Sequence, residues 1–207
     1  MNFLGKVTWK MVSTIIFLIG APGSGKGTLG RRLCEQYGMY HFSVGDYMRD
    51  LRRSPGSYAE VIQEAIQTAT LLPGNIIIPM LQRKLEKEER EGGYRVIVID
   101  GFPREVDQAV SFEEQIGKPA LAIYLNCPKD EAKRRYLSRN LPGRIEDTTD
   151  MFEKRYAEYD KNNTPILERY RQTGILEEVD SSTETQESYQ TLLDVLSRNA
   201  VWNRMLA

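Results

Sequence analysis

The sequence predicts an α/β fold built around a parallel sheet, and three observations lead to this prediction. Short runs of β-branched residues recur along the chain, and longer segments with a polar, helix-like pattern separate them. Repeated strand–helix–strand units of this kind are typical of a parallel sheet buried on both faces. The chain has 207 residues, of which 41% are hydrophobic, which is enough for one compact domain with a sizeable core.

We expect five strands, each corresponding to one of the apolar runs. Their predicted ranges are residues 14–19, 40–43, 96–99, 120–125 and 175–179. Helices are expected in most of the intervals between them. Residues 1–12 are interpreted as an N-terminal extension, followed by a single domain over residues 13–207.

Two stretches contain turn residues and are expected to stand apart from the sheet. Residues 45–91 have a helical pattern that is broken at Ser54-Pro55-Gly56 and at Pro73-Gly74, and they are too long for one crossover helix. We interpret them as a small inserted lobe. Residues 140–147, Asn-Leu-Pro-Gly-Arg-Ile-Glu-Asp, combine turn residues with opposite charges, and we interpret them as a short mobile loop.

Charge and composition argue against several classes of protein. The 28 Lys+Arg and 29 Asp+Glu residues give a net charge of −1, so no nucleic-acid partner is expected. Cys34, Cys127 and the single histidine, His41, are too few for a disulfide framework or a four-ligand zinc site. We expect a cytoplasmic location, with the nucleus as a second site. No apolar run approaches the roughly 20 residues of a membrane span, so no membrane partner is expected either.

The strongest chemical signal is the segment Gly20-Ala-Pro-Gly-Ser-Gly-Lys-Gly-Thr28. It lies between a predicted strand and a helical segment, the context that a phosphate-binding loop requires and that an ordinary glycine-rich turn rarely has. Its backbone N–H groups and the positive end of the following helix can surround an anion. Lys26 can reach the outer phosphates of a nucleotide. Gly27 stands where the general motif has Ser or Thr, so Thr28 or a water molecule would have to face magnesium.

A second signal is the segment Val96-Ile-Val-Ile-Asp-Gly-Phe-Pro-Arg104. It places the Asp100 carboxylate at the C-terminal end of a predicted strand, where open parallel sheets bind their ligands. Asp100 suits Mg²⁺ or its bound water, and Arg104 lies near the same edge. A helix cap or turn is the plainer explanation for such an aspartate, but it does not account for the neighbouring arginine.

Arginines recur beyond the fourth predicted strand. Arg135 and Arg139 share one face of a helix, Arg144 lies in the following loop and Arg155 lies on the next helix. A solvated basic face explains any one of them, and it is our interpretation of Arg134. Phosphoryl transfer between two phosphates requires positioning and charge neutralisation rather than proton removal, because the acceptor oxygen is already anionic. The combined pattern of arginines fits that chemistry.

Together these motifs resemble the adenylate kinase and UMP/CMP kinase family of nucleoside monophosphate kinases, of the short-lid type. The resemblance extends from Ile15 to about Leu196, and it rests on residues 20–28, 42–49, 72–73, 100–104 and 143–147, followed by Arg155. It implies a three-layer P-loop kinase fold with a five-stranded parallel sheet. It also implies an inserted helical lobe at about residues 43–72 for the nucleoside monophosphate (NMP), and a short lid at about residues 140–147 that closes over ATP.

The resemblance implies a role for each matching residue. The residues for ATP are Gly23, Ser24, Gly25, Lys26, Gly27, Thr28, Arg135 and Arg139, with Arg135 packed on the adenine. The residues for the NMP are Ser43, Arg49, Leu72, Gly101, Arg104, Gln108, Arg144 and Arg155. Arg49 and Arg104 would clamp the acceptor phosphate, and Gln108 would face its base. The catalytic set would be Lys26, Arg104, Arg139, Arg144 and Arg155, and Asp100 would hold the Mg²⁺ cofactor through water. A monomer that binds ATP and an NMP is expected.

Three residues depart from the family pattern. Val44 stands where a small or hydroxylated residue is usual, Ala69 where glycine is usual, and Glu146 where aspartate is usual. None of the departures removes a catalytic cation. Val44 and Ala69 add bulk where the family keeps space for the base, which should disfavour a purine more than a pyrimidine. We therefore predict UMP and CMP as acceptors ahead of AMP, with adenylate kinase activity as the alternative.

Two other classes of protein share part of this pattern. A P-loop GTPase would share the loop, but the chain has no Asn-Lys-x-Asp stretch to read guanine. An inactive nucleotide-binding scaffold is favoured only by the three departures, and the complete set of cations argues against it. His41 is interpreted as a structural histidine, and Tyr156, Tyr159 and Tyr170 as packing residues.

Overall fold

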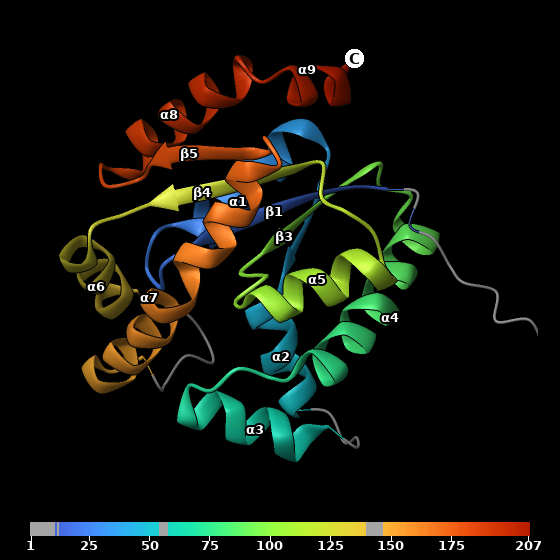
Figure 1. Cartoon of the computed structure of the whole chain (residues 1–207). Coiled ribbons are helices and arrows are strands. Elements are labelled where there is room, and N and C mark those ends of the chain that lie inside the picture. Colours follow the sequence, from blue (N-terminus) through green and yellow to red (C-terminus); the bar gives the residue numbers. More distant parts are fainter. Residues whose placement is uncertain (1–10, 12, 54–57, 140–146) are drawn as a thin grey trace, which may run out of the picture.

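Within the described residues, five parallel strands form one sheet in the order β2-β3-β1-β4-β5 (Figure 1). The computed structural model describes Met11 and residues 13–53, 58–139 and 147–207. The strands are β1 Thr14–Gly20, β2 Tyr40–Ser43, β3 Val96–Asp100, β4 Leu121–Asn126 and β5 Leu176–Asp180. Each differs from its predicted range by at most one residue at either end. The apolar runs therefore marked the strands correctly.

Helices cover both faces of the sheet, which confirms the predicted three-layer α/β architecture. They are α1 Lys26–Tyr37, α2 Val44–Arg53, α3 Ala59–Thr68, α4 Gly74–Gly92, α5 Val106–Gln115, α6 Lys129–Ser138, α7 Thr149–Gln172, α8 Thr185–Ser197 and α9 Ala200–Leu206. Side chains alternate between the faces along each strand. In β1, Phe17 packs with α4, α5 and α7, whereas Leu18 packs with α1, α8 and α9. Figure 1 shows α8 and α9 on one side of the sheet and α4 and α5 on the other.

The segment interpreted as one inserted lobe divides into two parts. The helices α2 and α3 pack on each other beyond the end of the sheet (Figure 1). In contrast, α4 packs along the sheet beside α5, and its Ile78, Leu81 and Leu85 are fully buried in the core. The interpretation of all of residues 45–91 as a lobe is therefore wrong for α4, because its buried apolar face makes it the crossover helix to β3.

The strand order determines where a ligand can bind. The chain runs from the central β1 to one side of the sheet and later returns to place β4 on its other side. Such a reversal opens a crevice at the carboxyl ends of the strands. Gly20 and Asp100 end neighbouring strands at this edge. The predicted extension, apart from Met11, and the predicted lid, apart from Asp147, lie outside the described residues.

Candidate active site

A cavity of about 540 Å³ opens at the carboxyl ends of β1 and β3. It brings together predicted site residues from five helices, from the last residues of β2 and β3 and from connecting loops. They are Gly23, Gly25, Lys26, Gly27, Thr28, Ser43, Arg49, Leu72, Asp100, Gly101, Arg104, Gln108, Arg135, Arg139 and Arg155. Two predicted residues are not among them. Ser24 belongs to the loop between β1 and α1, but its side chain is fully buried, so its hydroxyl cannot face a ligand there; Arg144 lies outside the described residues.

The loop between β1 and α1 wraps around the start of α1. At Gly23, φ is +88°, and a Cβ atom there would lie 2.0 Å from the carbonyl oxygen of Ala132 in α6. Only glycine permits this close approach, which seats the loop against α6. The first residues of α1 line the cavity, so the positive end of the helix faces it.

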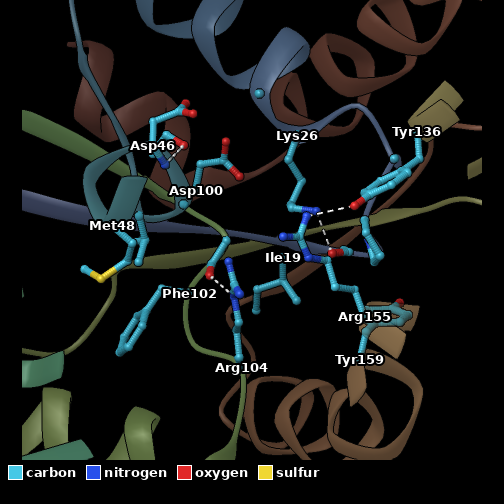
Figure 2. A pocket seen from close by; sticks show the side chains of 18 of the residues that line it. Ile19, Lys26, Asp46, Met48, Asp100, Phe102, Arg104, Tyr136, Arg155 and Tyr159 are labelled. Atoms are coloured by element: carbon cyan, nitrogen blue, oxygen red, sulfur yellow. Dashed lines mark hydrogen bonds between the residues drawn. The ribbon is translucent and has the colours of Figure 1, made fainter. Parts of the chain in front are cut away.

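The ammonium group of Lys26 lies over the same loop. Its Nζ donates hydrogen bonds of 2.7 Å to the carbonyl oxygens of Gly20 and Ala21. Figure 2 shows the side chain pointing into the cavity toward Arg155. A phosphate bound at the loop would therefore meet a lysine charge already held in place by the backbone.

Two arginines converge beside Gly45, at the start of α2. A Cβ atom at Gly45 would lie 3.4 Å from Arg49 Nη2 and 3.9 Å from Arg104 Nη2. Arg49 forms an ion pair with Asp46, and Arg104 Nε donates to the carbonyl oxygen of Gly101 at 2.9 Å. Because Gly45 has no side chain to fill this space, both guanidinium groups can reach one small anion there.

Arg104 lies in a strongly positive environment. Its side chain is open to the cavity, but the cavity walls surround it. This desolvation, together with the positive charges of Arg155 and Arg49, lowers the pKa of Arg104, while Asp100 opposes the effect. A doubly charged phosphate monoester would relieve the repulsion among the arginines, so this part of the site favours an anion.

A second pair of arginines meets at Asp147. Arg139 Nε donates to Asp147 Oδ2 at 2.6 Å, and Arg155 Nη1 lies 3.4 Å from Oδ1 of the same carboxylate. Arg155 belongs to α7 and Arg139 follows α6, so the carboxylate joins two helices. Both arginines line the cavity. Figure 2 shows Arg155 between Lys26 and Arg104.

Arg135 is fixed at the end of the cavity next to α8. It donates to the Glu131 carboxylate at 2.6 Å and to the carbonyl oxygens of Ser181 and Thr183. Hydrogen bonds with Arg134 and Arg135 lower the pKa of Glu131 to about 2, so the carboxylate stays charged. The guanidinium of Arg135 therefore presents a planar surface against which an adenine ring can stack. Arg134 is exposed at the rim, bound to Glu131, which fits its interpretation as a solvated charge.

Asp100 faces the beginning of α1. Its Oδ2 would lie 3.6 Å from a Cβ atom at Gly27, and the residue is buried. His41 Nε2 lies 3.3 Å from the same oxygen. The sequence interpretation of His41 as structural did not anticipate this contact. The pairing of β2 with β3, in which Ser43 lies beside Asp100, brings the two residues together.

The residues present fit a magnesium ion that is shared with a nucleotide. Within the described ranges, no group of three or more His, Cys, Asp or Glu side chains could hold a metal by itself. Mg²⁺ in nucleotide sites commonly takes one or two carboxylates, and phosphate oxygens and water complete its shell. Asp100 would supply the carboxylate, and Thr28, which is exposed and lines the same cavity, would offer a hydroxyl.

Gln108 connects two parts of the cavity wall. It is almost completely buried, its Nε2 donates to the Leu72 carbonyl oxygen, and its Oε1 accepts from the Arg104 backbone N–H, both at 3.1 Å. The prediction that Gln108 faces a base stays a prediction. Both ends of its amide already bond to backbone, so reading a base would require these bonds to be shared or exchanged.

Sequence reasoning missed several residues that line the cavity. Tyr159, interpreted as a packing residue, lines it and bonds to Tyr124 at 3.1 Å between hydroxyls; Asn163 Nδ2 donates to Tyr159 at 3.0 Å. Tyr136 lines the cavity as well. Helical spacing could have identified Tyr159, because it lies one turn after Arg155 on the same face of α7.

Comparison with known proteins places this geometry in context. A family model described as adenylate kinase matches residues 18–175. The chain is 33% identical to a UMP-CMP kinase from Lentinula edodes, over 86% of this chain and 82% of that protein. It is 33% identical to a UMP-CMP kinase from Xenopus tropicalis, over 89% and 97%. It is 32% identical to adenylate kinase isoenzyme 1 from Sus scrofa, over 89% and 96%.

Proposed function

The chain belongs to the adenylate kinase family and is a nucleoside monophosphate kinase, and on this premise we propose that UMP and CMP are its preferred acceptors. The reaction transfers the γ-phosphoryl group of ATP to the phosphate of an NMP, and it yields ADP and a nucleoside diphosphate. A monomer in the cytoplasm, with the nucleus as a second location, is part of the same proposal.

In the proposed mechanism, the protein positions two phosphates and neutralises their charge. The loop around Lys26 and the positive end of α1 hold the outer phosphates of ATP. Arg49 and Arg104, which converge beside Gly45, clamp the acceptor phosphate. Arg139 and Arg155, which line the same cavity and both approach Asp147, neutralise the charge that spreads over the transferring phosphoryl group in the transition state. Arg144 is assigned to the same centre from the sequence alone.

Magnesium is the proposed cofactor, and Asp100 is the residue proposed to hold it. When bound with ATP, Mg²⁺ neutralises charge on the phosphate oxygens. Asp100→Asn keeps the shape of the side chain but removes its charge, so the Mg²⁺ concentration for half-maximal rate should rise by about tenfold. The rate of ADP formation, measured over a series of Mg²⁺ concentrations, checks this expectation.

Asp107→Asn is the matched control, because Asp107 is exposed on α5 and does not line the cavity. Its Mg²⁺ dependence should equal that of the wild type. An unchanged Mg²⁺ dependence in Asp100→Asn would contradict the assignment.

The preference for pyrimidines rests on one observation, the bulk of two side chains in the acceptor part of the cavity. Val44, which is 2% exposed, and Ala69 both line the cavity, and Val44 belongs to the apolar cluster that contains Met48 and Ile62. Ala69 has a φ of +61°, a conformation that non-glycine residues rarely adopt. Both side chains reduce the space for a base, so a pyrimidine fits more easily than a purine. The similarity to proteins named UMP-CMP kinase supports the same choice.

The acceptor is identified by comparing kcat/KM for UMP, CMP, AMP and GMP at saturating ATP and Mg²⁺. UMP and CMP are expected to lead. If AMP led by tenfold or more, about 1.4 kcal/mol of transition-state discrimination, the chain would act as an adenylate kinase instead. The assignment as an NMP kinase would remain.

Ala69→Gly tests the physical reason for this preference. It removes a methyl group from the cavity, and it removes the backbone strain at residue 69, because glycine adopts the left-handed conformation readily. We expect kcat/KM for AMP to rise by about three- to tenfold relative to UMP, within the range for one methyl group in a pocket. Ala69→Ser retains the Cβ atom and adds a hydroxyl group, so it should not raise this ratio above the wild-type value. If the ratio of kcat/KM for AMP to kcat/KM for UMP were the same in Ala69→Gly as in the wild type, other residues would determine the choice of base.

A further inference from the structure

Tyr136 of α6 contacts two cationic residues of the proposed transfer centre through different parts of its side chain. It is fully buried from solvent and forms part of the cavity wall. Its hydroxyl accepts a hydrogen bond of 2.8 Å from Arg155 Nη1. Its ring lies beneath Arg139, whose Cζ is 4.1 Å from the ring centroid (Figure 2 shows Tyr136 and Arg155). One side chain thus touches both arginines that flank the predicted path of the phosphoryl group.

These contacts address an electrostatic problem of the site. Arg139 and Arg155 carry like charges, and Asp147 is the carboxylate that both approach. One carboxylate neutralises one of the two charges, so the arginines still repel each other. The ring face of a tyrosine attracts a guanidinium group, and the tyrosine hydroxyl can accept a hydrogen bond from another guanidinium group. Tyr136 therefore stabilises both cations without adding a negative charge that would oppose a phosphate.

The environment of Tyr136 keeps its phenol neutral, and its ring packs against Phe152. Burial raises the pKa of its phenol to about 12, against the opposing effect of Arg155 and with a contribution from Asp147. The ring of Phe152 packs edge-on against it, with centroids 5.3 Å apart. Because the phenol is neutral, buried and packed against Phe152, it offers Arg155 a hydrogen-bond acceptor in a defined position at neutral pH.

We propose that Tyr136 is a positioning residue for phosphoryl transfer: its hydroxyl orients Arg155 and its ring orients Arg139 before the substrates bind. The inference rests on the proposed roles of these two arginines. Preorganised cations stabilise a transition state without reorganisation during the reaction, so a looser arrangement should lower kcat rather than weaken substrate binding.

The test begins with Tyr136→Phe, which removes the hydroxyl and keeps the ring. We expect kcat to fall by about tenfold, with the KM values for ATP and the NMP within about twofold of wild type. Tyr136→Leu removes both contacts and should lower kcat further.

Tyr156→Phe is the matched control, because Tyr156 packs on the same Phe152 but does not line the cavity. Its kcat should equal that of the wild type. All rates are measured well below the melting temperature of each variant, so loss of stability alone leaves kcat unchanged.

A double-mutant cycle with Arg155→Ala separates positioning from packing. If the hydroxyl acts through Arg155, Tyr136→Phe should lower kcat in the wild-type background and have no further effect in Arg155→Ala. If Tyr136→Phe lowered kcat by the same factor in both backgrounds, the inference would be overturned. It would also be overturned if Tyr136→Phe had the wild-type kcat while Arg155→Ala had a lower one. An Arg155→Ala enzyme with wild-type kcat would instead refute the proposed role of Arg155, and the inference would fall with it.

Discussion

Replacing Lys26 with methionine is expected to lower kcat by about 10²- to 10³-fold and to leave the fold intact. Methionine keeps an unbranched apolar stem but lacks the charge that lies over the carbonyl oxygens of Gly20 and Ala21. That charge meets the outer phosphates of ATP, where negative charge must be neutralised during transfer. The rate of ADP formation with saturating substrates measures the loss, and circular dichroism reports the fold.

Lys118→Met is the control for this substitution. Lys118 is exposed after α5 and does not line the cavity, so its loss should leave kcat unchanged. A folded Lys26→Met protein with the wild-type kcat would show that the loop around residue 26 does not hold the reacting phosphates.

Replacing Arg104 with alanine should have an effect of similar size. We expect kcat to fall by about 10²-fold or more, because the acceptor phosphate loses one of the two guanidinium groups that converge beside Gly45. Arg104→Lys should recover part of the loss but not all of it, since an ammonium cannot form two parallel hydrogen bonds to a phosphate. Steady-state rates over a range of acceptor concentrations separate the effects on kcat and KM.

Arg95→Ala is the control here, because Arg95 is exposed before β3 and lies outside the cavity wall. It should behave as the wild type. If purified, folded Arg104→Ala turned over at the wild-type rate, the acceptor clamp would be refuted, and the site for the NMP would have to be sought elsewhere in the cavity.

Local pattern in the sequence was sufficient to predict the strands and the phosphate-binding loop. Apolar runs of strand length report burial directly, and the glycines around Lys26 have few other uses between a strand and a helix. The division of residues 45–91 could not be predicted in this way. The helical pattern of α4 resembles that of α2 and α3, and only packing against α5 and the sheet distinguishes it.

Contacts between neighbouring strands and between helices likewise could not be predicted from the sequence. His41 meets Asp100 because β2 pairs with β3, although the two residues are far apart in the chain. Tyr136 meets Arg155 because α6 packs on α7. The spacing of Tyr136, one helical turn before Arg139, could have indicated that the two side chains are neighbours. The pattern that predicted phosphoryl transfer consists of cationic residues, so it did not indicate a tyrosine.

The most direct test of the central claim is the stoichiometry of the products. The purified chain is incubated with ATP, Mg²⁺ and UMP, CMP, AMP or GMP in turn, and the nucleotides and inorganic phosphate are quantified by chromatography and ³¹P NMR. An NMP kinase produces one nucleoside diphosphate for each ADP derived from ATP, with little free phosphate, because the acceptor replaces water. Release of ADP and phosphate without a second diphosphate, or no turnover with any of the four acceptors, would contradict the account.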